Sequence, residues 1–341
     1  MLKNGYTQEY ADQLFKQIEG FGEYGFPESH AASFALLVYA SCWLKWHEPA
    51  CFLAAMLNSH PLGFYGPSQL VQDAQRHGVQ VRAVDVAHSE WDCTLENIGP
   101  HVPSQPAVRL GLRMVSGLSK AVAERIAHQR ALGAFASTQD LALRCLLDVG
   151  DLRALASADA LLSLSGHRRQ QVWEASALRA APALLQGAPI EEDALLLEPA
   201  PEGEEVVFDY ASVGLSLRSH PLALLRAQLE PKRLLTAEQM RDFPSGRLVR
   251  TCGIVTMRQQ PQTAKGVVFV TLEDETGSVN VIVWKAVKEQ FREVVYRARL
   301  MAVYGVWQRD EGGEVRHVVA KRLVDLTHLL GELSTVSRDF H

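Results

Sequence analysis

The sequence has 341 residues, of which 47% are hydrophobic and 21% are charged, and its formal net charge is −5. These proportions are typical of a soluble globular protein with roughly two to four domains, and they exclude wholesale disorder. The longest apolar run, residues 31–44, contains two serines and is shorter than a membrane span, so we expect a core helix there and no membrane partner. Five widely spaced cysteines form no CxxC pair, which indicates reduced thiols in a cytoplasmic protein rather than a zinc site.

The charge is unevenly distributed along the chain. Residues 186–210 contain eight acidic residues and no Lys or Arg, and removing these eight charges from the total of −5 leaves +3. Residues 107–180 hold ten basic and six acidic residues, and residues 246–327 hold thirteen and nine. Two mildly basic regions that flank an acidic connector are compatible with a nucleic-acid partner, although a solvated surface of mixed charge has the same composition.

Helices are predicted first in the chain. Residues 6–19 have helical spacing, a Gly- and Pro-rich loop follows, and a long apolar helix runs to about residue 46. His30, at the start of that helix, fits a ligand contact and a structural histidine equally well. Pro49 suits the first turn of another helix. A short helix at residues 68–77 precedes a strand at residues 79–86, which can pair with 91–95 and 108–115.

The periodicity changes from strand to helix within residues 111–128. Alternating apolar residues lead to a turn at residues 116–119, after which Leu118, Val122 and Ile126 recur along one helical face. Ser119 is a good N-cap, so the turn presents free backbone N–H groups at a helix N-terminus.

Such a turn suits a phosphate, and basic residues surround it. Taken alone, the motif favours an ordinary Gly-containing turn before an amphipathic helix. A second turn, Ser165-Gly166, repeats the arrangement. The candidate phosphate contacts are Arg113, Gly117, Leu118, Ser119, Lys120 and Arg125 at the first turn, and His167, Arg168 and Arg169 at the second.

Residues 181–205 are rich in Pro, Gly and Glu, which predicts a linker. The apolar residues 194–197 within it are also typical of a peptide that docks into a partner groove. Short helices are then expected up to residue 245.

The last region has an all-β pattern. Strands are predicted at residues 248–259, 266–274, 278–284, 298–309 and 314–326, with a helix between the third and the fourth, which is the order of an OB-fold. An OB-fold that binds single strands uses a basic groove with aromatic residues, of which about half should lie in so small a core. The candidates are Arg250, Arg258, Lys265, Phe269, Trp284, Arg299, Trp307 and Arg309.

Catalytic signatures are missing from the sequence. It contains no Walker A loop, HExxH motif or nucleophile elbow, and its acidic clusters fall in the linker and in a hairpin turn. We therefore assign no catalytic residue, metal ligand or cofactor to this chain.

Three stretches resemble the bacterial C-family replicases, the DNA polymerase III alpha subunits. YGFPESHAASFALLVYASCWLKWHEPACFLAAMLN is similar to the end of their fingers domain, RLGLRMVSGLSKAVAERI to their helix-hairpin-helix, and VGLSLRSHPL to the motif before their OB domain. The sequence FPESHAASFA and residues 337–341 are most similar to the error-prone, damage-inducible branch of this family. The resemblance covers the whole chain, as a C-terminal portion of such a polymerase.

The resemblance implies an α+β multidomain fold that ends in a five-stranded OB-fold barrel. The expected parts are the end of the helical fingers (1–62), a joining segment with a short helix and strands (63–106), the helix-hairpin-helix region (107–180), an acidic linker (181–210), a short helical connector (211–245), the OB-fold (246–330) and a tail (331–341).

The function implied is that of a DNA-directed DNA polymerase in translesion synthesis and damage-induced mutagenesis. Its palm, with catalytic aspartates and magnesium, lies outside this sequence, so the chain alone is expected to be inactive. Ser29 and His30 would lie near the nucleotide-facing fingers, the first turn would hold duplex phosphates of primer-template DNA, and the OB domain would lie near the single-stranded template. Ser119 stands where the family usually has a second glycine.

The linker departs from the family in its sliding-clamp peptide. Asp193, Leu195, Leu196 and Leu197 occupy that place without the family's Gln or terminal Phe. We therefore expect weak or indirect clamp binding and recruitment by accessory mutagenesis proteins. The alternative is a non-catalytic scaffold whose OB domain and linker dock to accessory proteins.

Overall fold

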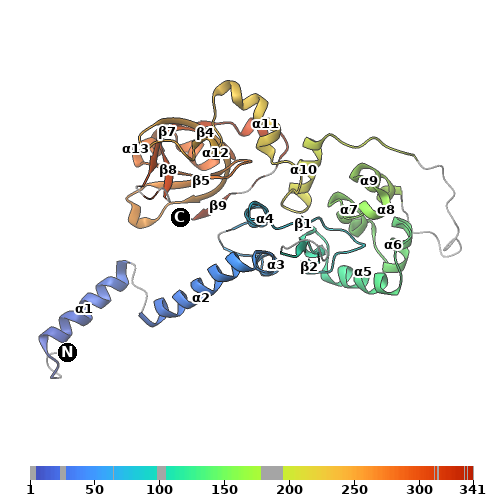
Figure 1. The fold of residues 1–341 in the computed structure, drawn as a ribbon, viewed down its shortest axis with the longest axis horizontal. Coiled ribbons are helices and arrows are strands. Elements are labelled where there is room, and N and C mark those ends of the chain that lie inside the picture. The colour runs from blue at the N-terminus through green and yellow to red at the C-terminus, as the bar shows by residue number, and fades with distance from the viewer. Residues whose placement is uncertain are drawn as a thin grey trace.

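The computed structural model describes residues 5–23, 28–63, 65–97, 105–177, 195–310, 312, 315–333, 335 and 337–340. Figure 1 shows a β-barrel on one side of the molecule and a helical region on the other, with α10 and α11 between them and α1 and α2 extending away from both. The sequence forms three groups of elements, which are described in turn.

The first group consists of α1 (Gln8–Glu23), α2 (Glu28–His47) and α3 (Pro49–Asn58). The expectation that residues 31–44 form a core helix is wrong, because the large side chains of α2 lie on the surface: Leu36 is 74% and Tyr39 is 72% exposed. Apolar residues surround the whole helix, which is the pattern of a helix that normally has neighbours on every side. The last turns of α2 do attach to the next group, through an ion pair of 2.7 Å between Lys45 and Asp73.

The second group is a helical region built on a small three-stranded sheet. The central strand, β3, runs parallel to β1 and antiparallel to β2. The strands are much shorter than predicted, since β1 covers two residues and β3 ends before a turn of 3-10 helix. The elements are α4 (Pro67–Arg76), β1 (Val81–Arg82), β2 (Thr94–Glu96), β3 (Ala107–Arg109), η2 (Leu112–Met114), α5 (Lys120–Leu132), α6 (Thr138–Cys145), α7 (Val149–Ser157), α8 (Leu162–Ser165) and α9 (Arg168–Ala177).

The chain leaves β3 at Gly111, where only glycine fits. A Cβ atom at this position would lie 2.3 Å from the carbonyl oxygen of Trp91. The main chain crosses so closely here because Leu112 and Arg113 donate hydrogen bonds to the carbonyls of Glu90 and Trp91, at 2.8 and 3.0 Å. This crossing turns the chain from the sheet into η2 and towards α5.

The third group is a connector followed by the barrel. The connector contains α10 (Glu202–Ser212), α11 (Pro221–Leu229), η4 (Glu230–Lys232) and α12 (Ala237–Met240). The barrel contains β4 (Leu248–Gln259), η5 (Gln262–Ala264), β5 (Val268–Glu273), β6 (Ser278–Val283), α13 (Lys285–Gln290), α14 (Arg292–Arg297), β7 (Leu300–Arg309) and β8 (Arg316–Asp325), and η6 (Thr327–Leu330) and β9 (Arg338–Phe340) follow it.

Five strands close the barrel. β4 pairs with β5 on one side and with β7 on the other, β8 pairs with β7, and β6 runs parallel to β8. Together with the β5–β6 pairing this completes the ring, with α13 and α14 between the third and fourth strands as in an OB-fold. The predicted fold class is therefore confirmed, whereas β9, which pairs in parallel with β4, was not predicted.

The connector contacts both the helical region and the barrel. The main-chain N–H of Ser116 donates to the carbonyl of Ser212, at the end of α10, at 2.8 Å. On the barrel side, Arg226 of α11 donates to the carboxylate of Glu275 at 2.7 Å. The helical region also contacts the barrel directly, because Gln72 of α4 donates to the carboxylate of Glu273 at 3.0 Å. Within the described ranges, no helix is both long and apolar enough to cross a membrane.

Candidate nucleic-acid interface

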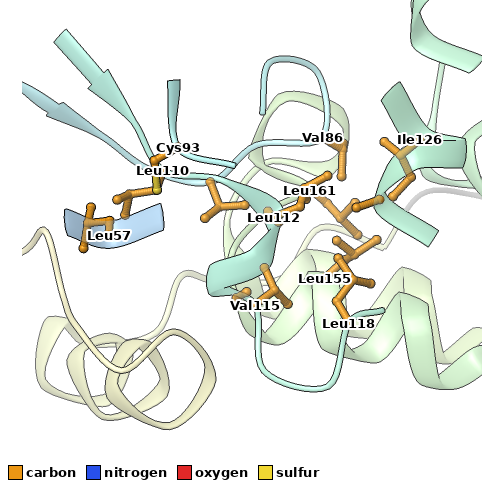
Figure 2. Close-up of a cluster of buried hydrophobic side chains, with 14 of the residues drawn as sticks. Leu57, Val86, Cys93, Leu110, Leu112, Val115, Leu118, Ile126, Leu155 and Leu161 are labelled. Carbon is orange, nitrogen blue, oxygen red and sulfur yellow. The ribbon is translucent and has the colours of Figure 1, made fainter. Parts of the chain in front are cut away.

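The turn between η2 and α5 is fixed to the hydrophobic core by its own apolar residue, Leu118. Leu118 is 7% exposed, and Figure 2 shows it pointing towards Leu155 in the cluster that also contains Val115 and Ile126. Gly117 has a φ of +84°, in the left-handed region that favours glycine. Burial of the Leu118 side chain therefore fixes the turn, while the backbone of the turn stays at the surface.

Ser119 caps the helix that follows. Its Oγ accepts a hydrogen bond of 3.3 Å from the main-chain N–H of Val122. In the part of the chain that the structure describes, no group accepts from the main-chain N–H of Ser119, Lys120 or Ala121. Three donors thus remain at the positive end of the 13-residue helix α5, which is the arrangement that binds anions.

Two of the predicted basic residues can supplement these donors. Lys120 is exposed, and its Nζ lies 3.7 Å from Glu124, a spacing that holds it only weakly. Arg125 is also exposed, and its Nε donates to the carbonyl of Cys145 at 2.9 Å, which holds the side chain at the end of α6. Arg113 instead braces the turn, because its Nη1 donates to the carbonyl of Asn58 at 2.5 Å and to Asp92 at 2.8 Å.

The second predicted turn, at Ser165-Gly166, is covered by residues 197–204, in the C-terminal half of the predicted linker. Nε2 of His167 lies 2.8 Å from the carbonyl oxygen of Leu197, and Arg169 donates to the carbonyl of Glu198 at 3.2 Å and to Glu204 at 3.3 Å. The main-chain N–H of Leu197 donates to Gln170 at 3.2 Å. These groups therefore hold residues 197–204 in place of the expected phosphate.

Arg168 is a buried structural residue, so its prediction as a DNA contact is wrong. It is 2% exposed, and its Nη1 lies 2.8 Å from both the carbonyl and a carboxylate oxygen of Glu205. Its Nη2 is paired with Asp209. Arg218 joins the cluster through Asp209 at 2.9 Å and Asp159 at 2.8 Å. Sequence reasoning missed this cluster because its members come from four separate segments.

Glu205 of α10 titrates unusually within this cluster. Burial raises the pKa of its carboxyl, although the guanidinium groups of Arg168 and Arg218 act in the opposite direction. Part of the acidic stretch that appeared to be a solvated linker therefore belongs to the interior.

Two barrel candidates also lie inside the protein, which corrects their assignment to DNA. Trp307 is 3% exposed and belongs to the barrel core. Arg258 is 4% exposed, donates from Nε to the carbonyl of Val295 at 2.6 Å, and pairs with Asp339 of β9 at 3.3 Å. Arg299 is partly buried and donates to the carbonyl of Leu333 at 2.6 Å, so it too fastens the C-terminal segment.

The remaining barrel candidates are exposed. Phe269 of β5 is 39% and Trp284, before α13, is 55% exposed. Lys265 lies in the β4–β5 connection, and Arg309 lies at the end of β7, before the β7–β8 connection. These two connections flank the β5–β6 face through which OB-folds bind nucleic acid. Arg250 lies on a different face, described below.

The other predicted residues belong to α2 and to the linker peptide. His30 lies in the first turn of α2, with its ring centroid 4.5 Å from that of Phe34, while the side chain of Ser29 and the whole of Asp193 lie outside the described residues. Leu195 and Leu196 are 52% and 85% exposed. Among the residues with described positions, no three His, Cys, Asp or Glu side chains are grouped to hold a metal ion.

The hairpin turn and the closed five-stranded barrel together define a nucleic-acid-binding class of protein. A family model described as a helix-hairpin-helix motif matches residues 78–171, and one described as an OB-fold nucleic acid binding domain matches residues 249–326. A solved asparaginyl-tRNA synthetase from Pyrococcus horikoshii covers 27% of this chain and 23% of its own at 23% identity, but its TM-score of 0.24 is too low to carry an argument.

Longer proteins match the chain over its whole length. Error-prone DNA polymerases match the whole chain at 52% identity in Alkalilimnicola ehrlichii, and at 54% in both Azoarcus sp. and Burkholderia pseudomallei. The chain covers 33%, 32% and 32% of these proteins, so it spans about a third of the length of the curated relatives it matches. The chain is therefore homologous throughout to part of the error-prone DNA polymerases, and the predicted resemblance is confirmed.

Proposed function

We propose that this chain is a DNA-binding C-terminal region of an error-prone DNA-directed DNA polymerase that acts in translesion synthesis and damage-induced mutagenesis. The turn before α5 holds duplex DNA, and the β5–β6 face of the barrel holds the single-stranded template. Nucleotidyl transfer takes place in a palm domain outside this sequence, where magnesium binds. Accessory mutagenesis proteins recruit the polymerase, and the sliding clamp contributes weakly.

The observation that carries this proposal is the set of three main-chain N–H groups at the start of α5, beside Lys120 and Arg125. Main-chain donors at a helix N-terminus bind phosphate oxygens and read no base sequence. A polymerase must hold its DNA product regardless of the base sequence, and contacts to phosphates alone meet this requirement. The relationship to error-prone DNA polymerases supports DNA as the ligand.

The exposed helix α2 fits the same proposal. In the parent polymerase it would pack against the rest of the fingers domain, with Ser29 and His30 near the incoming nucleotide. Its apolar surface, which includes Leu36 and Tyr39, would then be buried.

Charge reversal at the turn tests the proposal. We expect the double variant Lys120→Glu with Arg125→Glu to bind a short blunt DNA duplex about tenfold or more weakly at low salt, as measured by fluorescence anisotropy. Loss of two phosphate contacts should also reduce the slope of log K against log salt by about 1.8.

The matched control is Lys16→Glu with Arg292→Glu, which makes the same charge change at exposed positions far from the turn. We expect this control to retain most of the affinity. Equal losses in both double variants would show that only net charge matters, and an unchanged affinity in the first would show that the turn does not hold duplex DNA.

A further inference from the structure

A basic cavity lies on the outer face of the barrel, away from the β5–β6 face. It has a volume of about 390 Å³ and is lined by Lys232 and Arg233 after α11, Arg250 of β4, Tyr304 of β7 and Arg322 of β8. Arg250 pairs with Tyr304, and Tyr304 pairs with Arg322, so these three form one row across neighbouring strands. The backbone of the barrel therefore brings the two arginines to either side of one aromatic ring.

The cavity has no acidic residue to balance its charge. Four of its ten lining residues are Lys or Arg, and none is Asp or Glu. Within the described part of the chain, no carboxylate lies within 4.0 Å of a charged nitrogen of these four side chains. Other arginines of the chain, such as Arg168, Arg226 and Arg258, do have acidic partners. Because like charges in proximity repel each other, this grouping favours the binding of an anion.

The side chains are arranged for phosphate oxygens in particular. The guanidinium carbons of Arg250 and Arg322 lie 5.6 and 5.7 Å from the centre of the Tyr304 ring, where the negative face of the ring attracts them. Guanidinium groups present several N–H donors in one plane, which match two oxygens of a phosphate.

The floor of the cavity is apolar, with Ala302 of β7 and Val324 of β8 among its lining residues. Its volume falls in the range of small-ligand sites, which is roughly 300 to 1,000 Å³. A cationic rim over an apolar floor fits a phosphate group together with the sugar or base attached to it.

We propose that this cavity binds the phosphate groups of a nucleotide unit. The unit belongs either to a single strand of DNA that crosses β4, β7 and β8 or to a free polyphosphate compound such as a nucleoside triphosphate. In the first case the inference rests on the proposed function and adds a second DNA contact to the barrel. In the second case it stands apart from DNA binding.

The test uses the full 341-residue chain with Arg250→Gln and Arg322→Gln combined. The two probes are a labelled oligo-dT strand and inorganic tripolyphosphate, the latter measured by calorimetry. We expect affinity for one or both probes to fall about tenfold or more, and the salt slope for oligo-dT to decrease by about 1.4 if two phosphate contacts are lost. The matched control, Arg241→Gln with Arg292→Gln, removes two exposed charges elsewhere and should stay within about twofold.

Each outcome has one meaning. A selective loss of oligo-dT binding supports the site with DNA as the source, and a selective loss of tripolyphosphate binding supports it with a free ligand. The site is overturned if the wild-type chain binds neither probe, or if both affinities are equal in the Arg250/Arg322 variant and the control. If neither probe depends on Arg250 and Arg322 while duplex binding is intact, the cavity proposal fails and the hairpin proposal is unaffected. The single variant Lys232→Gln should lose affinity for the same probe as the double variant, by a smaller factor.

Discussion

The residue whose structure departs most from expectation is Arg168. It occurs in a run that has the composition of a phosphate site, yet its side chain is buried against Glu205 and Asp209 of α10. A run of basic residues beside a turn has the same sequence pattern in both situations. Arg168 is buried rather than exposed because α10, about forty residues further along the chain, packs against it.

Replacement of Arg168 should therefore affect stability rather than DNA affinity. We expect Arg168→Met to lower the free energy of unfolding by about 3–5 kcal/mol, because it leaves two buried carboxylates with Arg218 as their main partner. Arg169→Met, at a neighbouring position that is 42% exposed, should cost less than about 1 kcal/mol. Chemical denaturation followed by circular dichroism compares the two, and similar midpoints would contradict the structural role of Arg168.

At the scale of elements, the sequence predicts those with a strong local pattern. The capped helix after Ser119 and the five alternating strands were predicted correctly, because their periodicity is local and regular. The strand expected at residues 79–86 is reduced to Val81–Arg82, and β9 was missed. The formation of β9 depends on its pairing with β4 and on a contact between Arg258 and Asp339, which are far apart in the sequence.

Part of the predicted linker is fixed to the helical region. Leu197 is held at both its N–H and its carbonyl by α9 and the turn before it, so the predicted partner peptide is fixed at its C-terminal end. A peptide that must first be released binds its partner more weakly. We expect the chain to bind an isolated sliding clamp with a Kd above about 1 μM in surface plasmon resonance, and submicromolar binding would contradict this expectation.

At the scale of the whole molecule, the barrel topology followed from the order of the strands, whereas the arrangement of the groups did not. The connector α10 joins the hairpin region and the barrel through contacts between residues far apart in the sequence, such as Ser116 with Ser212. The exposure of α2 was also unexpected, since an apolar helix in isolation is indistinguishable from a core helix. Composition reveals that such a surface exists but not which part of the molecule covers it.

The central claim is that the backbone at the start of α5 holds duplex DNA. Amide hydrogen exchange measures those N–H groups directly, in the wild-type chain with and without a saturating blunt duplex. We predict slower exchange in peptides that contain residues 117–121 when the duplex is present, and no change in peptides from α7. Unchanged exchange at residues 117–121 under conditions where the duplex is bound would contradict the account.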